Sequence, residues 1–530
     1  MSKPWEPADH GSDSANLRRR TARATRWALI DNWGRQLLQL LVFVILARLL
    51  PPQDFGLVAL AMVFVMLASL FVDQGMGDAI IQRRVLEREH LDSAFWAALS
   101  MGAVLTAGGV VLAIPIATLL GEPRLQPVLQ ALSLAFLLTA VSAVPMGILR
   151  REMRFRSLAL RTMFSIVGGG AAGVFLALAG YGVWALVVQQ LLTAVLSAVA
   201  LMVASPWRPR PNFSRRHFRD LFGYGANIVG GDLLGYFTRY SDNLLIGAVL
   251  GTPALGHYAI AYRILDAGNH LLHGIARKVA FPALSRLQHE PTRLQAAYFR
   301  ITRVTAGVVL PAYVGMALVA PELIRAVFGG KWDEAVPVAA VLFLVGPALA
   351  VQGFGVTLLS VVGRPDIALR LRLVNTITAV TGFALAVSFG IVAVAAAFVV
   401  RGYLMVPLQL FFQRRYAGIP TRAYLSRLRG TVAATVLMAG AVLAAKWLMH
   451  PRVDNVVLLL VEFGVGAAAY VGALYVLDRA LLHQLIEFVT QALPGGERAQ
   501  QRFEQVAARR GRRSVEATLT AEERDDPIGL

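Results

Sequence analysis

The sequence contains no cysteine among its 530 residues, and only 16% of them are charged. Without cysteine the chain can form no disulfide, and it cannot use a thiolate as a nucleophile or a metal ligand. Soluble globular domains carry about 25% charged residues, so the scarcity of charge argues against a soluble fold. Histidines and carboxylates do not recur at metal-ligand spacing, and no nucleophile–base pairing is visible. We therefore expect neither a bound metal nor a cofactor.

Apolar residues make up 56% of the chain. They occur in repeated blocks of about 20, the length that a helix needs to cross a membrane. Because lipid offers no hydrogen bonds to a bare backbone, such blocks form helices. The sequence therefore predicts an all-α polytopic membrane protein with about 14 transmembrane helices. The expected spans are 27–48, 56–80, 92–118, 127–148, 158–179, 183–204, 222–250, 254–276, 304–321, 335–361, 367–389, 391–412, 430–448 and 455–477.

The basic residues predict how these spans are oriented. Of the 51 lysines and arginines, 41 lie in the two tails and in six arginine-rich connections, while the alternate connections hold only six. Cytoplasmic connections carry the excess of lysine and arginine, so we expect both termini in the cytoplasm. The net charge of +19 then reflects topology, and we expect no nucleic-acid partner. The first 26 residues are polar and lead into a full-length span, so we expect no cleaved signal peptide.

An internal repeat is visible at an offset of 200 residues. LARLLPPQDFGLVALA (46–61) aligns without a gap with IGAVLGTPALGHYAIA (246–261), and Gly56 falls on Gly256. Six spans return the chain to the same side of the membrane, so the two halves would be parallel repeats. In transporters this arrangement places a central site between the halves. We therefore expect two six-helix lobes around a central cavity, followed by two further helices.

These features predict seven segments. Two are lobes, one is the C-terminal helix pair, and the others are cytoplasmic tails and linkers. In chain order they are a basic N-terminal tail (1–26), the N-lobe (27–204), an inter-lobe linker (205–221), the C-lobe (222–412), a linker (413–429), the helix pair (430–477) and a C-terminal tail (478–530).

One predicted span, FGYGANIVGGDLLGYFTRYSDNLLIGAVLG (222–251), carries ionised side chains within an apolar stretch. An ionisable side chain in hydrocarbon costs at least about 2.5–3.5 kcal/mol, so such residues usually face a bundle interior or a water-filled cavity. At about 100° per residue, four of its polar residues fall in one narrow stripe. They are Asp232, Tyr236, Arg239 and Asn243.

Other spans carry polar residues of the same kind. The eighth span offers Arg263, Asp266 and His270, spaced so that the carboxylate can pair with either neighbour along the helix. Each charge alone is also explained by a structural ion pair, but the whole set favours a cavity lined by polar side chains. The remaining candidates are Asn32, Arg35, Gln36 and Gln39 in the first span, Tyr240 and Asp242 in the seventh, and Arg401 in the twelfth.

The residue types indicate what such a cavity would bind. Guanidinium groups match phosphate oxygens in a bidentate geometry, so mid-span arginines suit anions, while amides and tyrosines suit hydroxyl-rich groups. The combination fits a sugar attached to a phosphate. The candidates for sugar contact are Asn32, Gln36, Gln39, Tyr236, Tyr240 and Asn243. The candidates for coupling to a proton or another cation are Asp232, Asp242, Asp266 and His270.

Several blocks, in order over roughly residues 20–420, resemble the Wzx-type polysaccharide exporters of the multidrug/oligosaccharidyl-lipid/polysaccharide (MOP) superfamily. The blocks are ARLLPPQDFGLVALAMVF (47–64), LFVDQGMGDAIIQRR (70–84), REMRFRSLALR (151–161), GYGVWALVVQQL (180–191), YSDNLLIGAVLGTPALGHYAIAYRI (240–264), FPALSRLQ (281–288) and GKWDEAVPV (330–338).

This resemblance implies a function. Such proteins flip undecaprenyl-diphosphate-linked oligosaccharide across the bacterial inner membrane by alternating access, for exopolysaccharide or O-antigen synthesis. A polysaccharide polymerase and a chain-length regulator would then be partners, together with membrane lipids. By the same resemblance, arginines of the cavity contact the diphosphate or acidic sugars. In this chain those residues are Arg35, Arg239, Arg263 and Arg401.

Two alternatives stay open. A multidrug cation antiporter of the same superfamily typically has 12 spans and an acidic cavity, whereas this chain has more spans and mid-span arginines. A membrane polymerase or ligase usually places its catalytic groups in a sizeable periplasmic loop, and the longest loop expected on that side, 321–334, is short. We therefore expect a transporter and not an enzyme.

Overall fold

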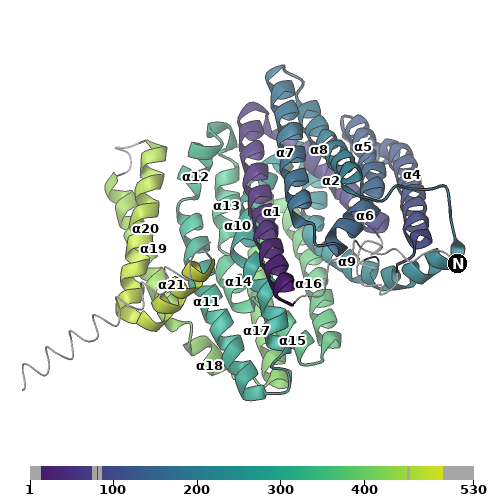
Figure 1. Ribbon diagram of the computed structural model, residues 1–530. Coiled ribbons are helices and arrows are strands. Elements are labelled where there is room, and N and C mark those ends of the chain that lie inside the picture. The colour runs from purple at the N-terminus through teal and green to yellow at the C-terminus, as the bar shows by residue number, and fades with distance from the viewer. Residues whose placement is uncertain (1–13, 74–79, 81–85, 450–453, 493–530) are drawn as a thin grey trace, which may run out of the picture.

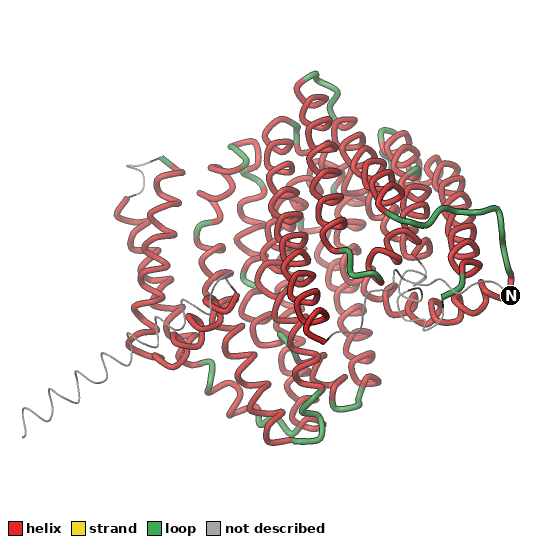
Figure 2. The backbone as a smooth tube through the Cα atoms, in the orientation of Figure 1, coloured by secondary structure: helices red, strands yellow, loops and turns green. Residues whose placement is uncertain are grey.

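The computed structural model describes residues 14–73, 80, 86–449 and 454–492, and leaves out some side chains within helices α1 (Ser14–Leu49), α9 (Arg215–Val249), α10 (Gly251–Ser285) and α21 (Arg479–Ala492). Helices make up most of the described chain, and one extended connection links α8 (Val183–Ala204) to α9 (Arg215–Val249), as Figure 1 and Figure 2 show. Eleven helical segments of the described residues are long and apolar enough to cross a membrane. The predicted all-α, multi-pass membrane protein is confirmed at this level.

The first group of helices, named the N-lobe, packs α7 against α1 and α8, and α4 against α5 and α6. Glycines of α7 make the contact with α8 close: a Cβ at Gly169 would lie 2.0 Å from the Thr193 hydroxyl oxygen. Small residues let membrane helices approach in this way. The helices are α1 (Ser14–Leu49), α2 (Pro52–Asp73), α4 (Arg88–Leu119), α5 (Leu125–Ser133), α6 (Ala135–Arg151), α7 (Phe155–Leu178) and α8 (Val183–Ala204).

The second group, named the C-lobe, follows a connection from the end of α8. Its helices are α9 (Arg215–Val249), α10 (Gly251–Ser285), α11 (Pro291–Leu318), α12 (Ala320–Val327), η1 (Gly330–Trp332), α13 (Ala335–Phe343), α14 (Gly346–Gln352), α15 (Gly355–Val361), α16 (Pro365–Ala386), η2 (Val387–Phe389) and α17 (Ile391–Ala417). Long helices α1, α9 and α10 occupy the three predicted spans that are not among the eleven.

Two predicted spans are interrupted. The span expected at 127–148 is divided between α5 and α6, and the one at 335–361 is divided into α13, α14 and α15. Gly346 begins α14, where a Cβ would lie 2.1 Å from the Tyr313 side chain of α11. Helix α14 therefore packs closely against α11 at this interruption. The apolar sequence of the span gave no indication of the break or of this contact.

The C-terminal helices stand at one edge of the molecule, beside α11 and α12 (Figure 1). They are α18 (Thr421–Ser426), α19 (Arg429–Met449), α20 (Asn455–Leu477) and α21 (Arg479–Ala492). The Arg303 guanidinium of α11 donates to both oxygens of Asp478, at 2.5 and 2.6 Å. This ion pair ties the end of α20 to the C-lobe.

The two lobes meet chiefly where α2 packs against α10. A Cβ at Gly56 would lie 1.7 Å from the Thr252 carbonyl oxygen, and a Cβ at Gly256 would lie 1.9 Å from the Pro52 carbonyl oxygen. Only glycine allows this approach from either side. The two glycines paired by the 200-residue offset thus make the same contact in opposite directions.

The Thr252 hydroxyl of α10 donates to Glu122 of the N-lobe at 3.1 Å. Arg48, Lys331 and Trp332 also form hydrogen bonds between the lobes beside this crossing, and we name the bonds of these three side chains the inter-lobe bridge. Lys331 Nζ donates to the carbonyl oxygens of Arg48, at 2.9 Å, and Leu50, at 2.8 Å, and Trp332 Nε1 donates to that of Ala47 at 3.0 Å. In return, Arg48 donates to the last carbonyls of α12, those of Ala326 and Val327. The last carbonyl groups of a helix have no partner within that helix. Here those at the end of α1 accept hydrogen bonds from the C-lobe, and those at the end of α12 accept hydrogen bonds from the N-lobe.

Candidate functional site

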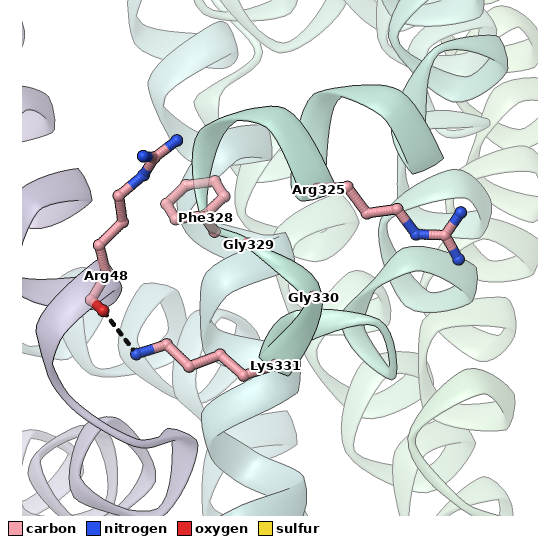
Figure 3. A pocket seen from close by; sticks show the side chains of 6 residues that line it. All are labelled: Arg48, Arg325, Phe328, Gly329, Gly330 and Lys331. Atoms are coloured by element: carbon pink, nitrogen blue, oxygen red, sulfur yellow. Dashed lines mark hydrogen bonds between the residues drawn. The ribbon is translucent and has the colours of Figure 1, made fainter. Parts of the chain in front are cut away.

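A surface pocket of about 440 Å³ lies against the inter-lobe bridge. Figure 3 shows its lining: Arg48, Arg325, Phe328, Gly329, Gly330 and Lys331. The cationic groups do not converge, because the Arg325 side chain points away from Arg48 (Figure 3) and pairs with Asp333 at 2.9 Å. This carboxylate raises the pKa of the Arg325 guanidinium, and burial lowers the pKa of Lys331. The pocket belongs to the closure between the lobes and offers no convergent anion site.

Two glutamines of α1 lie on the helix face that meets the C-lobe. Gln36, Gln39 and Phe43 follow one another at i, i+3 and i+7, so they share one face of the helix. The Arg263 guanidinium of α10 lies 5.6 Å from the centre of the Phe43 ring, within the range of a cation–π contact. Because Phe43 meets α10, the two glutamines beside it are directed to the same inter-lobe boundary.

The charged stripes of α9 and α10 meet at Asp266. Arg239 Nη2 lies 2.8 Å from Asp266 Oδ1, and His270 Nε2 lies 3.7 Å from Asp266 Oδ2. The carboxylate is 12% exposed, whereas the Arg239 and His270 side chains are 43% and 58% exposed. The sequence predicted the Asp266–His270 pairing along the helix, but the closer partner comes from the neighbouring helix. The anion is enclosed and the two basic groups remain accessible.

Two tyrosines flank this ion pair on α9. Tyr236 is 7% exposed, and its hydroxyl donates to the Val63 carbonyl of α2 at 2.6 Å. Its ring lies 5.2 Å from that of Tyr240, which in turn lies 5.9 Å from the Arg239 guanidinium. Tyr236 therefore holds α9 against the N-lobe, and Tyr240 presents an aromatic face beside the arginine.

Asp242 and Arg401 form a separate group inside the C-lobe. Asp242 is 1% exposed and accepts hydrogen bonds from the Tyr258 hydroxyl and the Asn243 backbone, both at 2.8 Å. Arg401 Nη1 donates to Asn375 Oδ1 at 3.2 Å, and its guanidinium lies 4.7 Å from the Phe398 ring. These hydrogen bonds join α9 to α10 and α16 to α17. The four predicted arginines are therefore not gathered at one point.

The remaining predicted residues are placed as follows. Arg35 and Asp232 are exposed, and Asn243 is half-buried. The side chain of Asn32 lies outside the part of α1 whose side chains the structure describes. We name the set that does meet at the inter-lobe boundary the central polar cluster. It consists of Gln36, Gln39, Tyr240, Arg239, Arg263, Asp266 and His270.

Four residues of these groups were not predicted from the sequence: Phe43, Tyr258, Tyr262 and Asn375. Tyr262 lies between the groups, with its ring 6.1 Å from Tyr258 and 6.0 Å from Phe398. Tyr258 and Tyr262 are four residues apart, and Tyr262 directly precedes Arg263. This spacing on a helix that carries charged residues could have been recognised in the sequence. Phe43 gave no such signal, since one phenylalanine in an apolar span looks like any other.

The central polar cluster suits an anionic, hydroxyl-bearing ligand. The cluster holds two guanidinium groups and one carboxylate, so it carries an excess of positive charge whether or not the histidine is protonated. A guanidinium bonded through one Nη keeps further N–H groups for a second acceptor, and phosphate accepts two at once. Amides from α1 lie across the boundary and can both donate to and accept from hydroxyl groups.

Comparisons with known sequences identify relatives. Residues 45–337 match the family described as polysaccharide biosynthesis protein. The succinoglycan biosynthesis transport protein ExoT of Rhizobium meliloti (strain 1021) is 30% identical over 322 residues, which are 61% of this chain and 65% of ExoT. The match therefore spans just under two thirds of that relative. The lipopolysaccharide biosynthesis protein WzxC of Escherichia coli (strain K12) is 25% identical over 367 residues, covering 68% of this chain and 74% of WzxC.

Solved structures agree in fold. Lipid II flippase MurJ, in an inward closed conformation, superimposes with a TM-score of 0.71 at 13% identity, covering 86% of this chain and 100% of MurJ. An inward-facing multidrug resistance transporter of the MATE family and MOP superfamily gives a TM-score of 0.58 at 16% identity, covering 72% of this chain and 94% of that one. At these identities the likeness shows the fold alone. Because the matched family region covers more than half of the sequence, the chain belongs to the polysaccharide biosynthesis protein family, as the sequence blocks predicted, with the fold of MOP-superfamily transporters.

Proposed function

We propose that this protein translocates undecaprenyl-diphosphate-linked oligosaccharide repeat units across the bacterial inner membrane, for exopolysaccharide or O-antigen synthesis. The observation that carries the proposal is the central polar cluster, in which Arg239 pairs with Asp266 and Arg263 lies over Phe43 of α1, the residue that shares a helix face with Gln36 and Gln39. The arginines bind the diphosphate or an acidic sugar, and the amides, Tyr240 and Asn243 bind sugar hydroxyls. The lipid tail stays in the bilayer between the lobes.

The proposed topology has 14 spans, with both termini in the cytoplasm and the lobes as parallel repeats. The crossing of α2 and α10 supports the repeat, because Gly56 and Gly256 make reciprocal contacts with residues at equivalent positions. The basic tails (1–26 and 478–530) and linkers (205–221 and 413–429) are then cytoplasmic. The inter-lobe bridge lies at the opposite, periplasmic end.

Transport proceeds by alternating access of the two lobes. The inter-lobe bridge joins them at one end, so in this arrangement the periplasmic side is closed and the central polar cluster receives the head group from the cytoplasmic leaflet. Opening at the bridge and closing at the other end would release it to the periplasmic leaflet. Asp266 and His270 are the coupling candidates that lie within reach of the bound anion, whereas Asp242 is enclosed by the C-lobe.

The test replaces Arg239 or Arg263 with alanine in a strain that lacks its own flippase. We expect polymer export to fall at least tenfold, because each substitution removes a charge-assisted contact worth about 1.5–3 kcal/mol. Polymer is measured on the cell surface, and protein level is measured in isolated membranes. Arg293→Ala is the matched control, since the Arg293 side chain is 73% exposed and pairs with Glu290, three residues before it. Unchanged export with normal protein level in both cluster variants would remove the site assignment.

The two alternative functions, cation antiporter and polymerase or ligase, predict different experimental results. For a cation antiporter, drug efflux would depend on Asp266 while polymer export would not. For a polymerase or ligase, the purified protein would form glycosidic bonds. The family match and the accessible Arg239 side chain favour the flippase. A polymerase and a chain-length regulator are the protein partners that this function requires, since the flipped unit must then be joined to others.

A further inference from the structure

A buried carboxyl group in the C-terminal helix pair has no role in the central polar cluster. Glu462 of α20 is 1% exposed, and neither of its carboxyl oxygens has a hydrogen-bond partner among the described residues. The nearest cation is Lys446 of α19, whose Nζ lies 3.9 Å from Glu462 Oε1. This distance is too long for a hydrogen bond. A carboxyl group held in this way within a spanning helix is a functional-site candidate by default.

The lysine is already engaged by a different carboxylate. Lys446 Nζ donates to Glu322 Oε2 at 2.9 Å and to the Leu318 carbonyl at 3.0 Å. The Glu322 side chain is 4% exposed, and that of Glu462 is fully enclosed. Two buried carboxyl groups therefore share one ammonium group, and only one of them is bonded to it.

The balance of charge between these three groups determines whether the Glu462 carboxyl group is protonated. If both glutamates were ionised, one negative charge would remain uncompensated in an apolar interior. Buried groups avoid this cost by taking up a proton. A metal cation would need more oxygen ligands than the two carboxyl groups supply, and the ammonium already lies between them. The geometry therefore favours a proton on Glu462.

Among the described residues, Arg325 of α12 also acts on Glu322, but its guanidinium is paired with the Asp333 carboxylate at 2.9 Å, so it adds no net charge to this balance. Helix α20 packs against α11, α12, α19 and α21. Glu322 of α12 and Lys446 of α19 face Glu462, while the Arg303–Asp478 pair lies 16 residues further along, about 24 Å away on a helix. His450 and Arg452, in the connection from α19 to α20, lie outside the described residues.

The shared lysine connects Glu462 to the closure between the lobes. Glu322 belongs to α12, a helix of eight residues. The last carbonyls of the same helix, at Ala326 and Val327, accept the Arg48 hydrogen bonds of the inter-lobe bridge. The Lys446–Glu322 contact is therefore at the start of α12, and the hydrogen bonds of the inter-lobe bridge are at its end.

We propose that Glu462 is a proton-binding site that controls the inter-lobe bridge through Lys446 and Glu322. With a proton on Glu462, Lys446 stays on Glu322, α12 keeps its position and the bridge is closed. When Glu462 releases the proton, its carboxylate competes for Lys446, the contact with Glu322 weakens and the bridge opens. The proposal rests on the proposed transport function, for which it names the ion and its site.

The test uses the full chain in lipid vesicles, with two complementary readouts. Infrared spectroscopy detects the carbonyl stretch of a protonated carboxyl group. Because the chain has no cysteine, the substitutions Gln53→Cys and Glu334→Cys allow spin labels to report the distance across the bridge. In the otherwise unaltered chain we expect the carbonyl band at acidic pH and its loss at alkaline pH, together with a longer label distance.

Glu462→Gln mimics the protonated group. It should lose the carbonyl band and keep the short label distance at every pH. Glu322→Gln should free Lys446, so that Glu462 ionises and the band disappears although Glu462 is present. Glu290→Gln, at a half-exposed surface ion pair, is the matched control and should keep both pH responses.

Three results would overturn the proposal: an unchanged carbonyl band in Glu462→Gln, a pH response of the label distance in that variant equal to that of the starting chain, or a distance that follows sodium concentration at fixed pH. Neither readout requires a substrate. Failure of the proposed flippase function would instead be seen in polymer export by the Arg239 and Arg263 variants, so the two failures are distinguishable.

Discussion

At the scale of single residues, several ionised side chains within the long apolar helices have specific partners on other helices. Asp266 is bonded to Arg239, and Arg263 lies over Phe43. Partnering offsets the cost of placing charge in an apolar region. The difference between these residues is exposure: Arg239 is open enough to meet a ligand, whereas Asp242 is enclosed and serves the packing of the C-lobe.

Tyr258→Phe tests the structural part of this distinction. The substitution removes the hydroxyl that donates to Asp242 and leaves a buried carboxyl oxygen without that donor. We expect a loss of about 1–3 kcal/mol in stability, measured by thermal unfolding in detergent. Tyr475→Phe, at a 56% exposed side chain, should stay within about 0.5 kcal/mol. Equal stability of the two variants would show that the Tyr258–Asp242 bond contributes little.

At the scale of elements, the crossing of α2 and α10 fixes how the lobes meet. The first turns of both helices approach until backbone touches backbone, at Gly56 and Gly256. No side chain can yield there, because the opposing atoms are carbonyl oxygens. Helix α12 is the second key element, since it connects the C-terminal pair, through Glu322, to the inter-lobe bridge.

Gly56→Ala and Gly256→Ala should each disturb the crossing. A methyl group at either position would overlap a carbonyl of the other helix, so the helices must move apart. Such overpacking costs about 1–3 kcal/mol, which thermal unfolding would detect. Gly108→Ala is the control, because nothing lies within 4 Å of the added Cβ, and alanine is the better helix former by up to about 1 kcal/mol. A crossing glycine that tolerates alanine as well as Gly108 does would contradict the close approach.

At the scale of the whole molecule, the N-lobe and the C-lobe are joined at one end by hydrogen bonds, and each lobe supplies donors to the other. Such reciprocal capping can form only when the lobes are together at that end. A transporter that alternates between two arrangements must break these bonds in one of them, and their strength then sets how often that side opens.

Lys331→Ala should shift the balance toward the arrangement that is open at the bridge. The variant removes two hydrogen bonds from a cationic donor, and a loss of about 1.4 kcal/mol corresponds to a tenfold change in population. A cysteine introduced by Leu50→Cys, which is 3% exposed, reports the opening by its rate of reaction with a membrane-impermeant maleimide. We expect that rate to rise about tenfold.

Arg325→Ala is the control for that measurement, because Arg325 lines the same pocket but bonds to Asp333 within the C-lobe. Its labelling rate should match that of the starting chain. A Lys331→Ala rate no higher than the control would show that the bridge does not govern access from this side.

The sequence by itself determined the membrane class and the family, because these depend on local properties: the length of apolar runs, the scarcity of charge and blocks of residues that resemble the family. It also located the stripes of polar residues, since helical periodicity alone groups Arg239 with Tyr236 and Asp266 with His270. Only the tertiary structure decided which partners these residues have. The Arg239–Asp266 pair, the position of Arg263 over Phe43 and the sharing of Lys446 by two glutamates all join different helices. Such contacts depend on how the helices rotate and cross, which the periodicity of a single helix does not contain.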